Sequence, residues 1–160
     1  MTELWSWRVD ARVAPVEIYS ALADVLGLPV MPLGAADPAR FPVAALLCDV
    51  WRQPGRYPLS VDCYGPPTGL AETTAVAAFA RRLGAYCLLP DDTFDPGRHL
   101  LVGPDGTTRP VHLDVRETDD GELLSNQRLC TVTSPGCRGW SQCHQSRWAP
   151  DSVVPALAAA

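Results

Sequence analysis

The amino-acid sequence predicts an α+β fold in which two helices cover one face of an antiparallel sheet. Three features favour this fold: stretches that alternate between apolar and polar residues, two stretches with apolar residues at helical spacing that end in glycine, and Pro- or Gly-rich segments between them. The expected order of strand, helix, two strands, helix and strand is typical of the split-βαβ (ferredoxin-like) arrangement. A C-terminal β-hairpin is expected to extend the sheet.

The first strand and the first helix are expected near the N-terminus. Trp5 and Trp7 lie on the same side of an alternating stretch, which indicates a strand with one buried face. Pro15 suits the first position of a helix, and Gly27 supplies a stop. Residues 28–42 are rich in Pro and Gly, so we expect a loop there.

A hairpin and the second helix are expected next. The apolar run at residues 43–53 and the alternating residues 59–64 flank Pro54-Gly55, which predicts two antiparallel strands joined by a turn. Residues 70–83 are Ala-rich and are followed by a glycine, which is typical of a helix and its end.

The last predicted elements are a short apolar strand at residues 85–89 and a second hairpin. Its arms are residues 99–102 and 108–115, joined by a Gly-Pro-Asp-Gly turn. We expect three segments in the whole chain: an α+β core domain at residues 1–125, a strap bearing Cys, Trp and Arg at residues 126–149, and a frayed tail at residues 150–160.

Composition indicates a compact domain with an acidic balance. The 160 residues are 47% hydrophobic and 19% charged, which is typical of a globular chain able to bury a core. The formal net charge of -5 argues against nucleic-acid binding, which needs a basic face, and suits a basic protein partner. Every basic residue is Arg, which favours a GC-rich bacterial source and excludes lysine chemistry.

The location of the protein is also predicted by composition. The charged, alternating N-terminus does not resemble a signal peptide, and no apolar run approaches the ~18 residues of a membrane span. We therefore expect no membrane association, a cytoplasmic location and reduced cysteines.

The strap contains the candidate metal-binding and catalytic residues Cys130, Cys137, Cys143 and His144. Three thiolates and an imidazole suit tetrahedral zinc, but this spacing lacks the close Cys pair of a zinc knuckle. Ordinary reduced cysteines are the favoured interpretation, and no cofactor is predicted. A thiolate at Cys137 or Cys143, with His144 as base, is the alternative for catalysis.

The two remaining histidines, His99 and His112, lie on the two arms of the second hairpin. The turn places His99 opposite Val111 and not opposite His112, so we expect the two rings on different faces of the sheet. A structural role is favoured for each over acid–base work with nearby acids.

An acidic surface is expected from residues 91–122, where acids outnumber arginines. Such a surface attracts a basic partner, although the acid-free, Arg-containing strap could fold back onto it instead. The strap tryptophans suit a binding surface or an anchor to the domain. The candidate partner-binding residues are Asp91, Asp92, Asp95, Asp119, Asp120, Trp140 and Trp148.

These features favour a small, acidic, non-enzymatic protein-binding domain of the cytoplasm, comparable to an immunity or inhibitor protein that meets a basic partner. The first alternative is a thiol- or metal-dependent enzyme that uses the Cys and His residues of the strap. The second alternative is a small-molecule binding domain that uses the sheet face and the Pro/Gly loops.

Overall fold

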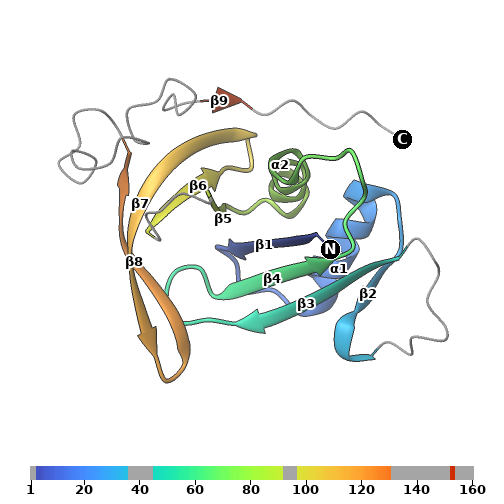
Figure 1. Cartoon of the computed structure of the whole chain (residues 1–160), viewed down its shortest axis with the longest axis horizontal. Helices are drawn as coiled ribbons and strands as arrows, with labels where there is room; N and C mark the ends of the chain where they lie inside the picture. Colours follow the sequence, from blue (N-terminus) through green and yellow to red (C-terminus); the bar gives the residue numbers. More distant parts are fainter. Residues whose placement is uncertain (1–2, 36–44, 92–96, 131–151, 154–160) are drawn as a thin grey trace.

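The computed structural model describes residues 3–35, 45–91, 97–130 and 152–153. Within these ranges the chain forms an α+β fold with two helices and a mixed sheet (Figure 1). The elements are β1 (Leu4–Val9), α1 (Pro15–Leu26), β2 (Val30–Pro32), the short 3-10 helix η1 (Leu33–Ala35), β3 (Leu46–Arg52), β4 (Leu59–Tyr64), α2 (Glu72–Leu83), β5 (Cys87–Pro90), β6 (Arg98–Val102), β7 (Thr107–Thr118), β8 (Gly121–Leu129) and β9 (Ser152–Val153). The sheet order is β2-β3-β4-β1-β5-β6-β7-β8, and β9 pairs with β7.

The sheet is larger than predicted, and it is mixed instead of antiparallel. β2 pairs in parallel with β3, with Val30 opposite Leu46, inside the segment that we expected to be a loop. Leu28 and Val30 pack against the main core, so their burial outweighs the turn-forming prolines beside them. Proline is tolerated there because β2 is an edge strand. β8 was not predicted because its sequence, Gly-Glu-Leu-Leu-Ser-Asn-Gln-Arg-Leu, does not alternate.

α1 begins and ends where local signals predict, whereas α2 ends where its glycine predicts but begins at Glu72, two residues later than expected. Pro15 is the first residue of α1, and Gly27 follows its last turn with φ 65°. Gly84 follows α2 with φ 72°, and its N–H donates to the carbonyl of Ala80 at 2.8 Å. A left-handed residue closes each helix because glycine adopts positive φ without a steric penalty.

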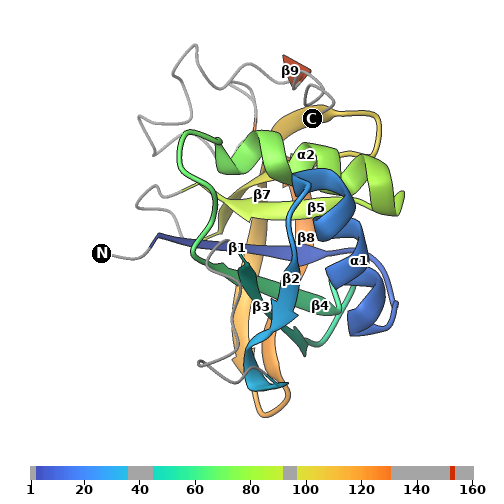
Figure 2. The ribbon, with the colours of Figure 1, turned by 90° about the vertical axis from the view of Figure 1, so that its right-hand side faces the viewer.

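The main core lies between the two helices and one face of β1, β3, β4 and β5. Trp5 and Trp7 are each 1% exposed, which confirms the predicted buried face of the first strand. Trp7 makes an edge-to-face contact with Phe79 of α2, with ring centroids 5.4 Å apart. Figure 2 shows α1 and α2 on the side of β1 and β4 opposite to the N-terminal end of the described chain.

The sheet consists of two halves joined by a short ladder. β1 and β5 pair only through Arg8 with Leu88 and Val9 with Cys87. Beyond this ladder β6, β7 and β8 curve away from β1 and β4 (Figure 1). A second apolar cluster fills the inside of the curve: Tyr57, Leu88, Leu101, Val111, Leu113 and Leu124.

The turn between β3 and β4 meets β8 and closes the curved half of the sheet. Gln53 Oε1 accepts a hydrogen bond from the Glu122 amide at 2.9 Å, and Gly55 forms an isolated bridge with Leu124. The Tyr57 hydroxyl donates to Gln127 Oε1. These contacts attach β8 to the first half of the sheet, although the two lie far apart in the sequence.

Gly121 at the start of β8 is a position where this closure depends on glycine. Its φ is 122°, and an added Cβ would lie 2.3 Å from Gln53 Oε1 and 3.3 Å from Pro54 Cδ. We expect Gly121→Ala to lower the free energy of unfolding by about 1–3 kcal/mol, measured by urea denaturation. Gly34→Ala is the control, because nothing lies within 4 Å of its added Cβ. Equal urea midpoints for the two variants would contradict this role of Gly121.

Candidate functional site

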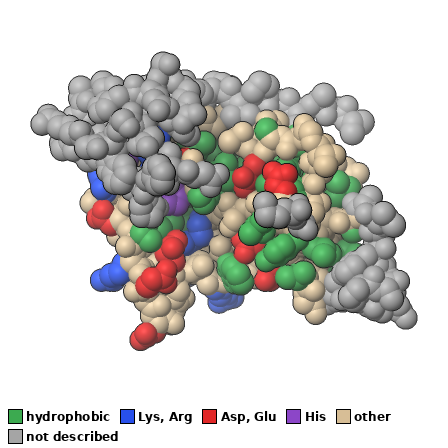
Figure 3. All heavy atoms as spheres, in the orientation of Figure 1, with side chains coloured by type: hydrophobic (Ala, Val, Ile, Leu, Met, Phe, Trp, Pro, Cys, Tyr) green, Lys and Arg blue, Asp and Glu red, His purple; other side chains and the backbone are tan. Residues whose placement is uncertain are grey.

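The face of β1, β3 and β4 that turns away from the helices carries a polar row. Ser6 pairs with Asp62, and Asp62 pairs with Asp49 on the next strand. Side chains at directly paired positions point to the same face of a sheet. We call this surface the open face. Figure 3 shows acidic and hydrophobic side chains gathered over these strands.

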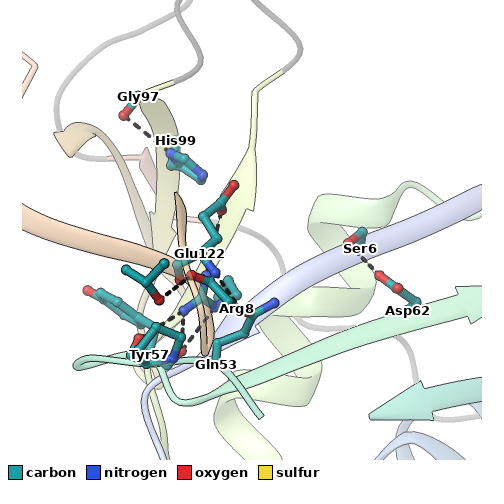
Figure 4. Close-up of polar contacts among 11 residues, drawn as sticks. Ser6, Arg8, Gln53, Tyr57, Asp62, Gly97, His99 and Glu122 are labelled. Atoms are coloured by element: carbon teal, nitrogen blue, oxygen red, sulfur yellow. Dashed lines mark hydrogen bonds and ion pairs between the residues drawn. The ribbon is translucent and has the colours of Figure 1, made fainter. Parts of the chain in front are cut away.

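Hydrogen bonds fix part of this row in place. Ser6 Oγ donates to Asp62 Oδ1 at 2.6 Å (Figure 4), and Asp62 is 7% exposed. The Ser6 amide donates to Glu72 Oε1 at 2.9 Å. That amide lies beyond the short β1–β5 ladder, so a side chain at the start of α2 replaces the missing strand partner.

The two aspartates form a like-charge pair that has no counterion among the described residues. No arginine or histidine in the part of the chain that the structure describes forms an ion pair with Asp49 or Asp62. Like charges directly opposite each other on adjacent strands destabilise a sheet. Burial raises the pKa of Tyr64, and the charges of Asp62 and Asp49 raise it further. The open face is therefore locally negative.

Apolar side chains flank this pair. Leu4 pairs with Tyr64 and is 50% exposed, and Trp51 pairs with Ser60 and is 46% exposed. Both lie at positions that alternate with buried core residues, so they share the open face with the aspartates. Exposed aromatic side chains such as Trp51 are enriched in protein-binding surfaces.

A second acidic surface lies at the end of the ribbon formed by β7 and β8. Glu117, Asp119 and Asp120 are exposed there, and none forms an ion pair within the described ranges. We call these three residues the acidic tip. Figure 3 shows acidic side chains at the lower left, where Figure 1 draws the end of this ribbon.

Further along the ribbon, the first residues of the predicted strap contact the acidic segment. Arg128 Nη1 lies 3.1 Å from Asp114 Oδ1, and Asn126 donates to Asp114 Oδ2 at 3.1 Å. These contacts with Asn126 and then Arg128 lower the pKa of the Asp114 carboxyl. The ion pair is exposed to solvent, so its contribution to stability is small. β8 runs on to Leu129, so the first residues of the strap belong to the sheet.

Arg8 is a buried cation of β1 that contacts the start of β8. Its Nε and Nη2 donate to the Tyr57 carbonyl at 3.0 and 2.7 Å, and its Nη1 donates to the Glu122 carbonyl at 3.1 Å (Figure 4). Nη1 also lies 3.7 Å from Glu122 Oε1. Burial lowers the pKa of Arg8, and the Glu122 carboxylate opposes this shift. These N–H groups donate to backbone carbonyls, so the guanidinium links the β3–β4 connection to β8 and does not act as a ligand-binding group.

His99 and Asp91 are both buried. His99 Nδ1 lies 3.2 Å from the Gly97 carbonyl, and its partner across the ladder is Val111 while His112 pairs with Arg98. The two histidines therefore occupy different faces, which confirms the predicted register. The Asp91 side chain is 1% exposed and lies 3.1 Å from Arg98 Nη1. Asp91, expected on a partner-binding surface, is instead engaged inside the fold.

The His99 imidazole makes stability depend on pH. Burial lowers its pKa below the usual 6.5, although the Gly97 hydrogen bond and nearby carboxylates oppose the shift. The unfolded chain therefore binds the proton more readily, so stability is full above the unfolded pKa and is lost as pH falls through the folded one. We expect the free energy of unfolding to fall more steeply between about pH 7 and about pH 5 in the wild type than in His99→Gln, measured by urea denaturation. Equal slopes would contradict the prediction.

The cysteines within the described ranges are poor nucleophiles. Cys48, Cys63, Cys87 and Cys130 are buried and form no disulfide. A hydrogen bond with Cys48 and then burial raise the pKa of the Cys63 thiol, and burial raises that of Cys87. No group of three metal-ligating residues occurs in the described part. The other candidates lie outside the described residues: Cys137, Cys143, His144, Asp92, Asp95, Trp140 and Trp148.

Thiol accessibility tests the burial of the four described cysteines. We expect Cys48, Cys63, Cys87 and Cys130 to resist iodoacetamide in the native protein because they are buried. Peptide mass spectrometry before and after denaturation checks this at each position, and the denatured protein is the control for intrinsic reactivity. Fast native alkylation of any of these four would contradict the buried arrangement.

The acid pair was missed at the sequence level because its register was not predictable. Pro54-Gly55 indicated a turn between the two predicted strands, but it did not indicate which residues face each other across the hairpin. The pairing of Arg52 with Leu59 places Asp49 opposite Asp62. The neighbour of each side chain depends on this register. An acid inside each predicted strand of a hairpin was the available signal.

The fold and the site define an α+β protein with an acidic open sheet face and an acidic ribbon. No protein-family model matches the chain, and no curated protein or solved structure matches it. Among the described residues, neither helix has the length and apolar character to cross a membrane.

Proposed function

We propose that this protein is a non-enzymatic, cytoplasmic protein-binding domain whose open face receives basic side chains of a partner. The observation that supports it is the cross-strand pair of Asp49 and Asp62, which has no counterion among the described residues. The role is comparable to that of a small acidic immunity or inhibitor protein. No cofactor takes part in this function.

The chemistry of the pair suits an arginine of the partner. A guanidinium presents several N–H donors in a planar fork, so it can bond to both carboxylates at once. Burying it there would remove the repulsion between Asp49 and Asp62. Contact with Trp51 and Leu4 would exclude water around the charges. This strengthens the attraction between the guanidinium and the carboxylates.

The acidic tip extends the attraction for a basic partner. Asp119 and Asp120 were candidates from the sequence, and both are exposed in the fold. With the net charge of -5, they speed the encounter with a positive surface more than they add to final affinity. The strap tryptophans Trp140 and Trp148 are proposed as additional contacts.

The fold itself supports a finer proposal. We infer that β1, α1, β3, β4, α2 and β5 form a split-βαβ (ferredoxin-like) unit, to which the hairpins of β6, β7 and β8 are added. The support is the antiparallel pairing of β1 with both β4 and β5. In such a unit the helices cover one face and leave the other free for a partner.

Affinity capture from the source organism tests the proposed function. The wild-type protein should recover one basic protein whose yield falls as salt rises. Asp49→Asn with Asp62→Asn should lose this protein. Glu3→Gln with Asp24→Asn is the matched control, since it removes the same charge from exposed positions away from the pair. Recovery of no protein at low salt, or equal recovery by both double variants, would refute the proposal.

A further inference from the structure

A groove lies where the connection from β1 to α1 meets the end of the β3–β4 hairpin. Its volume is ≈ 680 Å³. Small-molecule sites typically span ~300–1,000 Å³ and are lined mainly by apolar groups. The apolar residues of the lining include Val13, Pro15, Val50, Pro54, Pro58 and Leu59. We call this cavity the Arg12–Arg52 groove, after the two cations that also line it.

The two arginines give the groove a charge opposite to that of the open face. Arg12 and Arg52 are exposed, and neither forms an ion pair or a hydrogen bond with any described residue. The acids close in sequence to Arg12 are engaged: Asp10 Oδ2 lies 3.0 Å from Arg56 Nε, and Glu17 Oε2 accepts from the Ala14 amide at 2.9 Å. Two guanidinium groups that no described residue pairs with lie beside one apolar cavity, and they mark a positive site on an acidic protein.

We propose that the Arg12–Arg52 groove binds an organic carboxylate with a flat apolar body. Guanidinium groups bond to carboxylates through paired N–H donors, which sets the orientation of the ligand. A flat body can fill the apolar lining to which Val13, Pro15 and Val50 contribute. An inorganic anion would bind to the two arginines but leave the apolar lining exposed to water. A basic partner would be repelled by the arginines.

Titration calorimetry of the full chain tests this ligand class. Naphthoate is the probe, naphthamide has the same body without the charge, and inorganic phosphate has charge without the body. We expect saturable binding of naphthoate and binding of the other two that is at least about tenfold weaker. Equal binding of naphthamide would show an apolar pocket only, and equal binding of phosphate would show a simple anion site. Either result, or no saturable binding of naphthoate, overturns the proposal.

Variants assign the binding to the groove. Arg12→Gln with Arg52→Gln should lower the affinity for naphthoate at least about tenfold, because each lost guanidinium removes charge-assisted hydrogen bonds. Arg116→Gln removes an exposed arginine of the ribbon and should leave the affinity unchanged. Since Asp49→Asn should also leave it unchanged, failure here is distinguishable from failure of the proposed protein-binding function. Undiminished binding by the double arginine variant overturns the assignment.

Discussion

Replacing Arg8 by alanine is expected to lower the free energy of unfolding by about 3 kcal/mol. The guanidinium is the donor that satisfies the carbonyls of Tyr57 and Glu122, and its Nη2 lies 3.4 Å from the carbonyl of Pro54. Arg8→Ala leaves these acceptors with no donor at a place that the turn and β8 cover. A buried acceptor without its partner costs about 1–3 kcal/mol by itself.

Urea denaturation followed by circular dichroism measures this effect. Arg82→Ala is the matched control, because its ion pair with Asp24 is short, at 2.8 Å, while both side chains are 54% exposed. Removing that exposed pair should cost less than about 1 kcal/mol. Arg8→Lys should recover part of the loss, since an ammonium keeps the charge but has no planar fork. Similar losses for Arg8→Ala and Arg82→Ala would show that the link does not hold the two halves together.

Asp49→Asn is expected to change stability and binding in opposite directions. Removing one of two carboxylates that face each other should raise the free energy of unfolding by up to about 1 kcal/mol. The same change should lower the affinity for the captured partner by about tenfold to about a hundredfold, because a hydrogen bond to a charged group contributes about 1.5–3 kcal/mol. If the pair binds a partner as proposed, the repulsion between Asp49 and Asp62 is retained at the expense of stability.

Two measurements on one set of variants check this opposition. Urea midpoints report the stability, and titration calorimetry with the captured partner reports the affinity. Asp24→Asn is the control for charge, because it removes an acid from the exposed surface of α1. A lower stability of Asp49→Asn than of the wild type would contradict the proposed role of the pair. An unchanged affinity of this variant for the partner would contradict it too.

The local parts of the fold could be predicted because their signals are local. A proline and two glycines define the ends of the helices, since each acts through the φ angle of its own residue. Alternation identified the buried side of β1, because successive side chains of a strand point to opposite faces. The edge strand β2 and the ribbon strand β8 have no such alternation, although each pairs with the strand next to it along the chain.

The sequence by itself determined the two helices, the buried tryptophans and an excess of acids, because capping, periodicity and composition are properties of short stretches. Only the tertiary structure decided which charges are engaged. Asp91 meets Arg98 and Arg8 meets Glu122 inside the fold, while Asp49 meets another acid. A charge is neutralised by whatever lies within a few ångströms of it, and that neighbour depends on strand register and on the curvature of the whole sheet.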